Sequence, residues 1–151
     1  MVPPRFPAIE ELLTHRGNML LIDHVLACGP EGIRVAARVD GGAWYADMDG
    51  AMPAWIGIEL MAQAIAALVG LTARDQGLPP RRGLLLGTRA FTASVPSFAR
   101  NAALVVAASE VFQEANGLAA FDARIELADE TVAEATLKVF EPADFKSILD
   151  Q

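Results

Sequence analysis

The clearest pattern in the sequence is a long apolar run in the middle of the chain. Across residues 53–73 apolar side chains occupy almost every position, and only Trp55, Glu59 and Gln63 carry hydrogen-bonding heads before Thr72. A helix that is apolar around its whole circumference is buried in a core or in a membrane. A carboxylate such as Glu59 is costly in that position unless another group pairs with it or uses it.

The segments on either side of this run alternate between apolar and polar side chains, which is typical of strands with one wet face. Residues 121–127 show the pattern plainly, because Phe121, Ala123 and Ile125 alternate with charged residues. Gly29-Pro30-Glu31-Gly32 and Asn116-Gly117 are turn signals between successive strands. The predicted elements are a short helical opening at 7–13, strands at 19–28 and 33–39, the helix at 53–74, and strands at 83–94, 102–113, 121–127 and 133–139.

The order of these elements predicts the fold class. The later strands expose one polar face and need cover for the other, and the long helix is the only predicted element apolar enough to provide it. A curved antiparallel sheet wrapped around one central helix satisfies both requirements. We therefore predict an α+β protein with a single domain over residues 1–151.

Charge and composition exclude several classes of protein. A net charge of −7 argues against general nucleic-acid binding, and the single cysteine, Cys28, excludes a disulfide framework. Because residues 1–7 lack the apolar run of a signal peptide, we expect a cytoplasmic protein. The central helix, about 30 Å long, would span a bilayer. Glu59 and Gln63 near its middle would be costly there, so we expect no membrane span.

Two motifs resemble the β-hydroxyacyl-acyl-carrier-protein dehydratase family. Residues 13–25 read LTHRGNMLLIDHV, against a family pattern of P-H-R-x-P-x-L-L-x-D-R-V; Thr14, Asn18 and His24 depart from it. Residues 53–63 read PAWIGIELMAQ and are similar to the family's P-G-V-x-x-x-E-A-M-A-Q. The residues of this second motif most resemble those of the ApeP-like branch, which is associated with aryl-polyene and fatty-acid-like biosynthesis.

The resemblance implies a hot-dog fold, in which the sheet wraps around the helix, and a thioester substrate carried on an acyl carrier protein. It also implies a dimer in which a histidine and a glutamate from different subunits form the active site. The glutamate corresponds to Glu59. The family histidine lies in an H-F-P-G segment, and counting back from Glu59 without gaps puts Tyr45 at its position. Half of the usual catalytic pair is therefore absent from this segment.

Glu59 is the main catalytic candidate, because burial against apolar walls would raise the pKa of its carboxyl and make it a proton donor near neutral pH. Gln63 lies one turn further along the same face and would either bind substrate or hold backbone groups. Tyr45 could act as a weak acid, although an unperturbed pKa of about 10 makes it a poor base. The alternative for Tyr45 is a packing or lining role.

We expect structural roles for the remaining candidate acids and for the two histidines. Asp47 and Asp49 are expected to be solvated loop acids or helix caps, with activation of a water as the alternative. His15 is expected to be structural at the entry to the first strand, and His24 a packed or edge histidine. Because no third ligand recurs at a useful spacing, we expect no metal site, and we expect no cofactor.

Three more residues near the start of the helix are candidates for substrate binding. Gly57 lies where helical N–H groups are free, and in the hot-dog fold such groups polarise the thioester carbonyl. The alternative is that a glycine lets a strand pack closely. Trp55 and Met52 would line an acyl tunnel or fill the core.

Basic residues gather in one part of the chain. Residues 74–109 contain five arginines and one acid, which gives a local charge of about +4 in an acidic chain. Arg74, Arg81 and Arg82 are the candidates for docking an acidic carrier protein or its pantetheine phosphate. The alternative is a solvated face with counter-charges from other segments.

Three functions remain open from the sequence. The first is a 3-hydroxyacyl-carrier-protein dehydratase, either a degenerate homodimer or one half of a heterodimer with a paralogous hot-dog subunit that supplies the histidine. The second is a hot-dog acyl-thioesterase that uses Glu59, Asp47 or Asp49. The third is a non-catalytic subunit that binds an acyl chain or a carrier protein.

Overall fold

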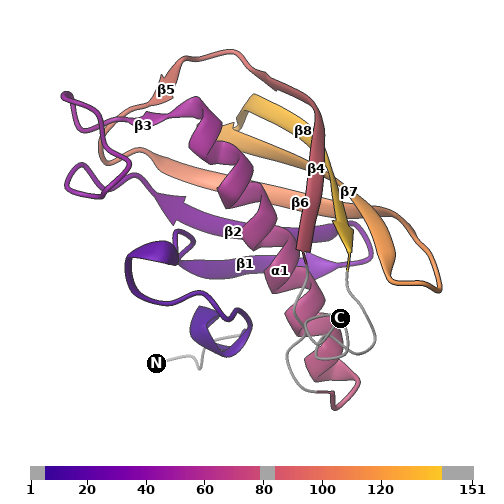
Figure 1. The fold of residues 1–151 in the computed structure, drawn as a ribbon. Helices are drawn as coiled ribbons and strands as arrows, with labels where there is room; N and C mark the ends of the chain where they lie inside the picture. The colour runs from indigo at the N-terminus through magenta and orange to yellow at the C-terminus, as the bar shows by residue number, and fades with distance from the viewer. Residues whose placement is uncertain (1–5, 79–83, 141–151) are drawn as a thin grey trace, which may run out of the picture.

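The computed structural model describes residues 6–78 and 84–140, and its main feature is a six-stranded antiparallel sheet with one long helix across one face (Figure 1). The strand order in the sheet is β1-β2-β6-β7-β8-β4. The elements of this layer are β1 (His24–Gly29), β2 (Gly32–Arg38), α1 (Gly57–Asp75), β4 (Leu84–Ala93), β6 (Ala103–Gln113), β7 (Leu118–Leu127) and β8 (Glu130–Phe140). The predicted α+β class and the arrangement of sheet and helix are confirmed.

Smaller elements complete the fold. A short pair of strands, β3 (Met52–Pro53) and β5 (Ser97–Phe98), lies beside the start of the helix (Figure 1). Three 3₁₀ turns, η1 (Ile9–Glu11), η2 (Gly17–Met19) and η3 (Ala54–Ile56), precede β1 and α1. Pro53 was predicted to open the helix but belongs to β3, so the α-helix itself begins later, at Gly57.

The first strand is shorter than its sequence pattern predicts. It was expected to begin at Met19 but begins at His24. The backbone before it turns through η2, and the N–H of Leu21 and the C=O of Met19 are bound by the side chain of Gln63 instead of by a neighbouring strand. A tertiary contact therefore replaces part of the expected ladder.

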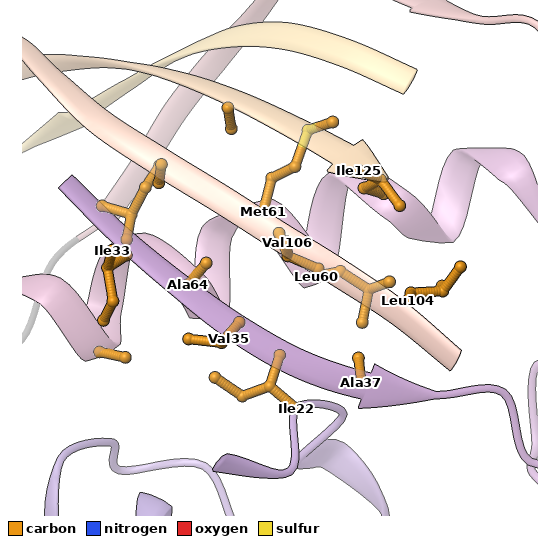
Figure 2. Close-up of a cluster of buried hydrophobic side chains, with 14 of the residues drawn as sticks. Ile22, Ile33, Val35, Ala37, Leu60, Met61, Ala64, Leu104, Val106 and Ile125 are labelled. Carbon is orange, nitrogen blue, oxygen red and sulfur yellow. The ribbon is translucent and has the colours of Figure 1, made fainter. Parts of the chain in front are cut away.

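Helix α1 is apolar all round because it is covered on two sides. Leu60, Met61 and Ala64 are fully buried in the main core, where they meet Val35 and Val106 from the sheet (Figure 2). By length and composition, Ala54–Asp75 could also cross a membrane, with a mean hydropathy of 1.8, but 61% of that apolar window is buried inside the fold. A core helix passes the same test, so this hydropathy carries no membrane assignment.

The second cover is the segment that carries η1, which lies directly on the helix backbone at Gly70. A Cβ atom at Gly70 would lie 2.5 Å from the carbonyl oxygen of Leu12. Real Cβ atoms do not approach backbone oxygens that closely, so glycine is required at this position for the segment to sit where it does. The close approach places the residues after Leu12 over the same face of α1 that carries Gln63.

We expect Gly70→Ala to lower the free energy of unfolding by about 1–3 kcal/mol, because the added methyl group would push Leu12 away. Alanine is otherwise the better helix former by about 0.8–1.0 kcal/mol, so helix propensity alone predicts the opposite sign. Urea denaturation measures the difference. Gly29→Ala is the matched control, because a Cβ there meets nothing within 4 Å; greater stability of the Gly70→Ala protein would contradict the close contact.

Candidate functional site

Glu59 lies in the first turn of α1. Its side chain is 38% exposed. The expectation that it is buried against apolar walls is therefore wrong for this subunit. The apolar residues of α1 turn toward the sheet and the N-terminal segment, while Glu59 lies where neither layer covers the helix completely.

Gln63, one turn further along, is fully buried. Its Oε1 accepts a hydrogen bond from the Leu21 N–H at 2.8 Å, and its Nε2 donates to the Met19 carbonyl at 2.8 Å and to Glu59 Oε1 at 3.0 Å. Because Leu21 requires an acceptor and Met19 requires a donor, the amide can face only one way. The hydrogen bond to Glu59 therefore comes from a group whose orientation is set by the backbone.

His15 lies beside Glu59. It was expected to be structural at the entry to the first strand, and its Nε2 is 3.5 Å from Glu59 Oε1, a contact that the sequence did not predict. Its Nδ1 is buried and has no hydrogen-bond partner among the described residues. The sequence signal for this contact was that His15 lies in the first family-like motif and Glu59 in the second. The other histidine, His24, is exposed at the start of β1.

Arg16 holds the backbone that presents His15. Its guanidinium donates to the carbonyl oxygens of His15 at 2.6 Å, Leu13 at 2.8 Å and Glu10 at 2.8 Å. An arginine fork that binds three carbonyls in a short loop restricts the loop to one shape. In the first motif, His15 therefore carries the imidazole and Arg16 fixes the loop that presents it.

The two oxygens of Glu59 have different surroundings. Oε1 faces both Gln63 Nε2 and His15 Nε2, whereas no described residue donates a hydrogen bond to Oε2. A carboxyl group arranged in this way has one oxygen anchored to the protein. The other oxygen is left for a substrate, for water or for a group from another subunit.

Tyr45 lies apart from this cluster. It is buried, its Oη accepts a hydrogen bond from the N–H of Asp40 at 2.9 Å, and its ring packs edge-on against Trp44. Burial raises the pKa of Tyr45; the Asp40 N–H opposes this, while the charges of Asp40 and Asp23 reinforce it. Within the described chain no hydrogen bond joins Tyr45 to Glu59, so its predicted catalytic role gains no support from the geometry.

The acids of the same loop serve the loop itself. Asp47 Oδ1 accepts hydrogen bonds from the N–H groups of Asp49 and Ala51, both at 2.9 Å. Asp47 and Asp49 are exposed, as expected of loop acids, but neither caps α1, whose N-cap residue is Ile56 and which has no side-chain cap. Over residues 6–78 and 84–140, no group of three or more His, Cys, Asp or Glu side chains is placed to hold a metal ion.

The three candidate binding residues near the helix start separate into core and surface. Met52 is buried in the main cluster, and a Cβ at Gly57 would lie 2.7 Å from Ile125 Cδ1, so this glycine allows close packing on β7. The Gly57 N–H donates hydrogen bonds to the carbonyl oxygens of Ala54 and Trp55. The prediction that it is a free donor is therefore wrong. Trp55 is 64% exposed, so it does not fill the core of this subunit.

The basic candidates are spread along the molecule. Arg74 is exposed in the last turn of α1, about 22 Å from Glu59 along the helix axis at 1.5 Å per residue. Arg81 and Arg82 lie outside the described residues. Arg100, which belongs to the same basic stretch, is exposed and packs against Gly41 and Gly50 in the loop before β3.

Several solved structures share this architecture. The chain superposes on the dehydratase heterocomplex ApeI:P from Xenorhabdus doucetiae with a TM-score of 0.88 and 23% identity, covering 96% of this chain and 97% of that one. It superposes on a mutant phenylacetic acid degradation protein PaaI from Thermus thermophilus with a TM-score of 0.55 and 22% identity, covering 77% of this chain and 90% of that one. For a hypothetical thioesterase with coenzyme A from Streptococcus pneumoniae, the TM-score is 0.57 and the identity 14%, covering 78% of this chain and 84% of that one.

The antiparallel sheet wrapped around one central helix is the hot-dog fold, as these matches show. A family model described as ApeP dehydratase, of the ApeP-like family, matches residues 7–150. The chain belongs to the ApeP-like dehydratase family. No curated protein matches the sequence.

We expect Gln63→Leu to lower the free energy of unfolding by about 1–3 kcal/mol, because it leaves the Leu21 N–H and the Met19 C=O without their partner. Thermal or urea denaturation measures the loss. Gln76→Leu, at the exposed C-terminal end of α1, is the matched control and should change stability by less than about 0.5 kcal/mol. Equal losses in the two variants would show that the Gln63 contacts do not stabilise the fold.

Proposed function

We propose that this chain supplies Glu59 as the general acid of a 3-hydroxyacyl-carrier-protein dehydratase, and that a second hot-dog subunit supplies the base. The observation that carries the proposal is the asymmetry of the Glu59 carboxyl group. Oε1 is held by Gln63 and faces His15, while Oε2 has no partner among the described residues and the side chain is partly exposed. Because the Gln63 amide donates a hydrogen bond to Oε1, the acidic proton of a neutral carboxyl group belongs on Oε2.

This arrangement suits the acid half of a dehydration. A base removes the α-proton of the substrate, the electron pair of that C–H bond forms the α,β double bond, and the C–O bond at the β-carbon breaks. Glu59 Oε2 gives its proton to the departing oxygen, which leaves as water. Such a transfer contributes about 10²–10⁴-fold to the rate when acid and substrate are aligned.

The base has no obvious source at this site within the described chain. His15 turns its Nε2 toward Glu59 and its Nδ1 into the protein, so neither nitrogen faces an open side of the carboxyl group. The Tyr45 hydroxyl is engaged with the Asp40 backbone, and His24 is in β1. The similarity to a protein described as a dehydratase heterocomplex supports a second hot-dog subunit as the source.

The substrate in this proposal is an acyl thioester on an acidic carrier protein. The basic stretch of the chain, in which Arg74, Arg89 and Arg100 are exposed, supports it, since cationic side chains attract a partner of opposite charge. Trp55 is exposed one helical turn before Glu59, on the same face, where an apolar ring would contact an acyl chain or a partner subunit. The same proposal places the protein in the cytoplasm.

The test is an assay for the α,β-unsaturated thioester with a 3-hydroxyacyl carrier-protein substrate. The purified chain alone should be inactive, and the chain copurified with the hot-dog subunit encoded nearest to its gene should be active. In that complex, Glu59→Gln should lower kcat by about 10²-fold or more, because the amide cannot give up a proton in this way. Glu130→Gln, an exposed acid at the start of β8, is the matched control and should keep full activity.

Three results would redirect the assignment. Full dehydration by the chain alone would remove the need for a second subunit. Release of free thiol from acyl thioesters, lost in Glu59→Gln, would identify a thioesterase that uses the same carboxylate to activate water. Thermal stabilisation by an acyl carrier protein with neither reaction would identify a binding subunit.

A further inference from the structure

The contact between His15 and Glu59 is not used by the proposed reaction. The imidazole Nε2 and the carboxylate Oε1 are 3.5 Å apart, and the two side chains are 33% and 38% exposed. The distance is longer than an ordinary N–H···O hydrogen bond, so this contact is weaker than the one from Gln63 at 3.0 Å. It is nevertheless on the same oxygen, and it comes from a different segment of the chain.

The burial of Nδ1 decides what His15 can do. Nδ1 has no hydrogen-bond partner among the described residues and no contact with solvent. A base must reach the proton that it removes, and the only accessible nitrogen of this ring is already directed at Glu59. His15 is therefore poorly placed to act on a substrate itself and well placed to act through Glu59.

The carboxyl group that Nε2 faces indicates where the ring hydrogen lies. A neutral imidazole carries one N–H and one lone pair. The carboxylate oxygen is an acceptor, so the nitrogen that faces it carries the hydrogen, and Nδ1 carries the lone pair. With hydrogen on Nε2, the polar N–H of the ring faces Oε1 at 3.5 Å, and its attraction adds to the hydrogen bond from Gln63.

We infer that His15 is a positioning residue, which together with Gln63 holds Oε1 so that the proton to be transferred resides on Oε2. A single hydrogen bond would leave the carboxyl group free to turn about that contact, whereas a second polar contact on the same oxygen restricts the turn. The inference rests on the proposed function, because it concerns the orientation of the proposed acid. Misplacing a reacting group by about 1 Å can lower a rate by about 10²-fold.

The surrounding structure is built to hold the imidazole at this point. Arg16 binds the carbonyl oxygens of Glu10, Leu13 and His15, and Leu12 lies against the bare backbone of Gly70. The loop is thereby fixed to the helix on which Glu59 stands. Since Gln63 fixes the next stretch of chain through Met19 and Leu21, the positions on both sides of His15 are restrained.

Steady-state kinetics of the active complex tests the inference. His15→Leu should lower kcat by about 10- to 100-fold with little change in KM, because orientation is lost while binding is kept. His15→Gln places an amide N–H near the position of Nε2 and should recover most of that loss. His24→Leu is the matched control, since it removes the other histidine, which lies outside the site, and should keep full activity.

A double-mutant comparison separates this inference from the proposed function. In a Glu59→Gln background, His15→Leu should add no further loss, because the residue acts through the carboxyl group. If Glu59→Gln is inactive while His15→Leu has full kcat, the positioning role is wrong and the acid role stands. If Glu59→Gln keeps full activity, the proposed function is wrong and the positioning role falls with it.

The imidazole nitrogen NMR signals give a readout that does not depend on activity. The chain has two histidines, so the His24→Leu variant assigns the spectrum directly. The His15 signals should show hydrogen on Nε2, and Glu59→Gln should shift them while leaving the His24 signals in place. Unshifted His15 signals, or hydrogen on Nδ1, would overturn the inference.

Discussion

The side-chain amide of Gln63 is the interaction on which the rest of the site depends. It is fully buried, and its two polar atoms bind the backbone of Met19 and Leu21 and the carboxylate of Glu59. A buried amide of this kind is expensive to leave unsatisfied, so the N-terminal segment must lie against the helix for the fold to be stable. The same bonds that dock this segment also orient the proposed catalytic acid.

Coverage from two sides explains both the composition of the central helix and the location of the site. The sheet takes one face of α1, and the segment around η1 takes part of the opposite face, where Gly70 admits the backbone of Leu12. Helix residues under either layer must be apolar or fully hydrogen-bonded. Glu59 stands at the end of the helix where the cover is incomplete, and there a polar side chain can be retained and can meet other molecules.

The candidate site could be predicted only in part. Position on the central helix and the family-like motif identified Glu59 and Gln63, because both signals lie within one short stretch of sequence. Local sequence gave no hint of the exposure of Glu59, since its neighbours are apolar whichever way it points. The contact between His15 and Glu59 was not predicted for a related reason: the loop of His15 is held by Arg16 and by contact with Gly70, and neither interaction has a periodic pattern.

The sequence by itself determined the class of fold and the candidate acid, because the alternation of strands, the turn residues and the apolar helix are local properties that each segment shows on its own. Tertiary structure alone decided which groups surround that acid. The pairing of His15 with Glu59, the capture of Met19 and Leu21 by Gln63, and the close packing of Gly57 on β7 join residues far apart in the chain. Such contacts depend on how finished elements pack in space, and no local pattern of residues encodes that packing.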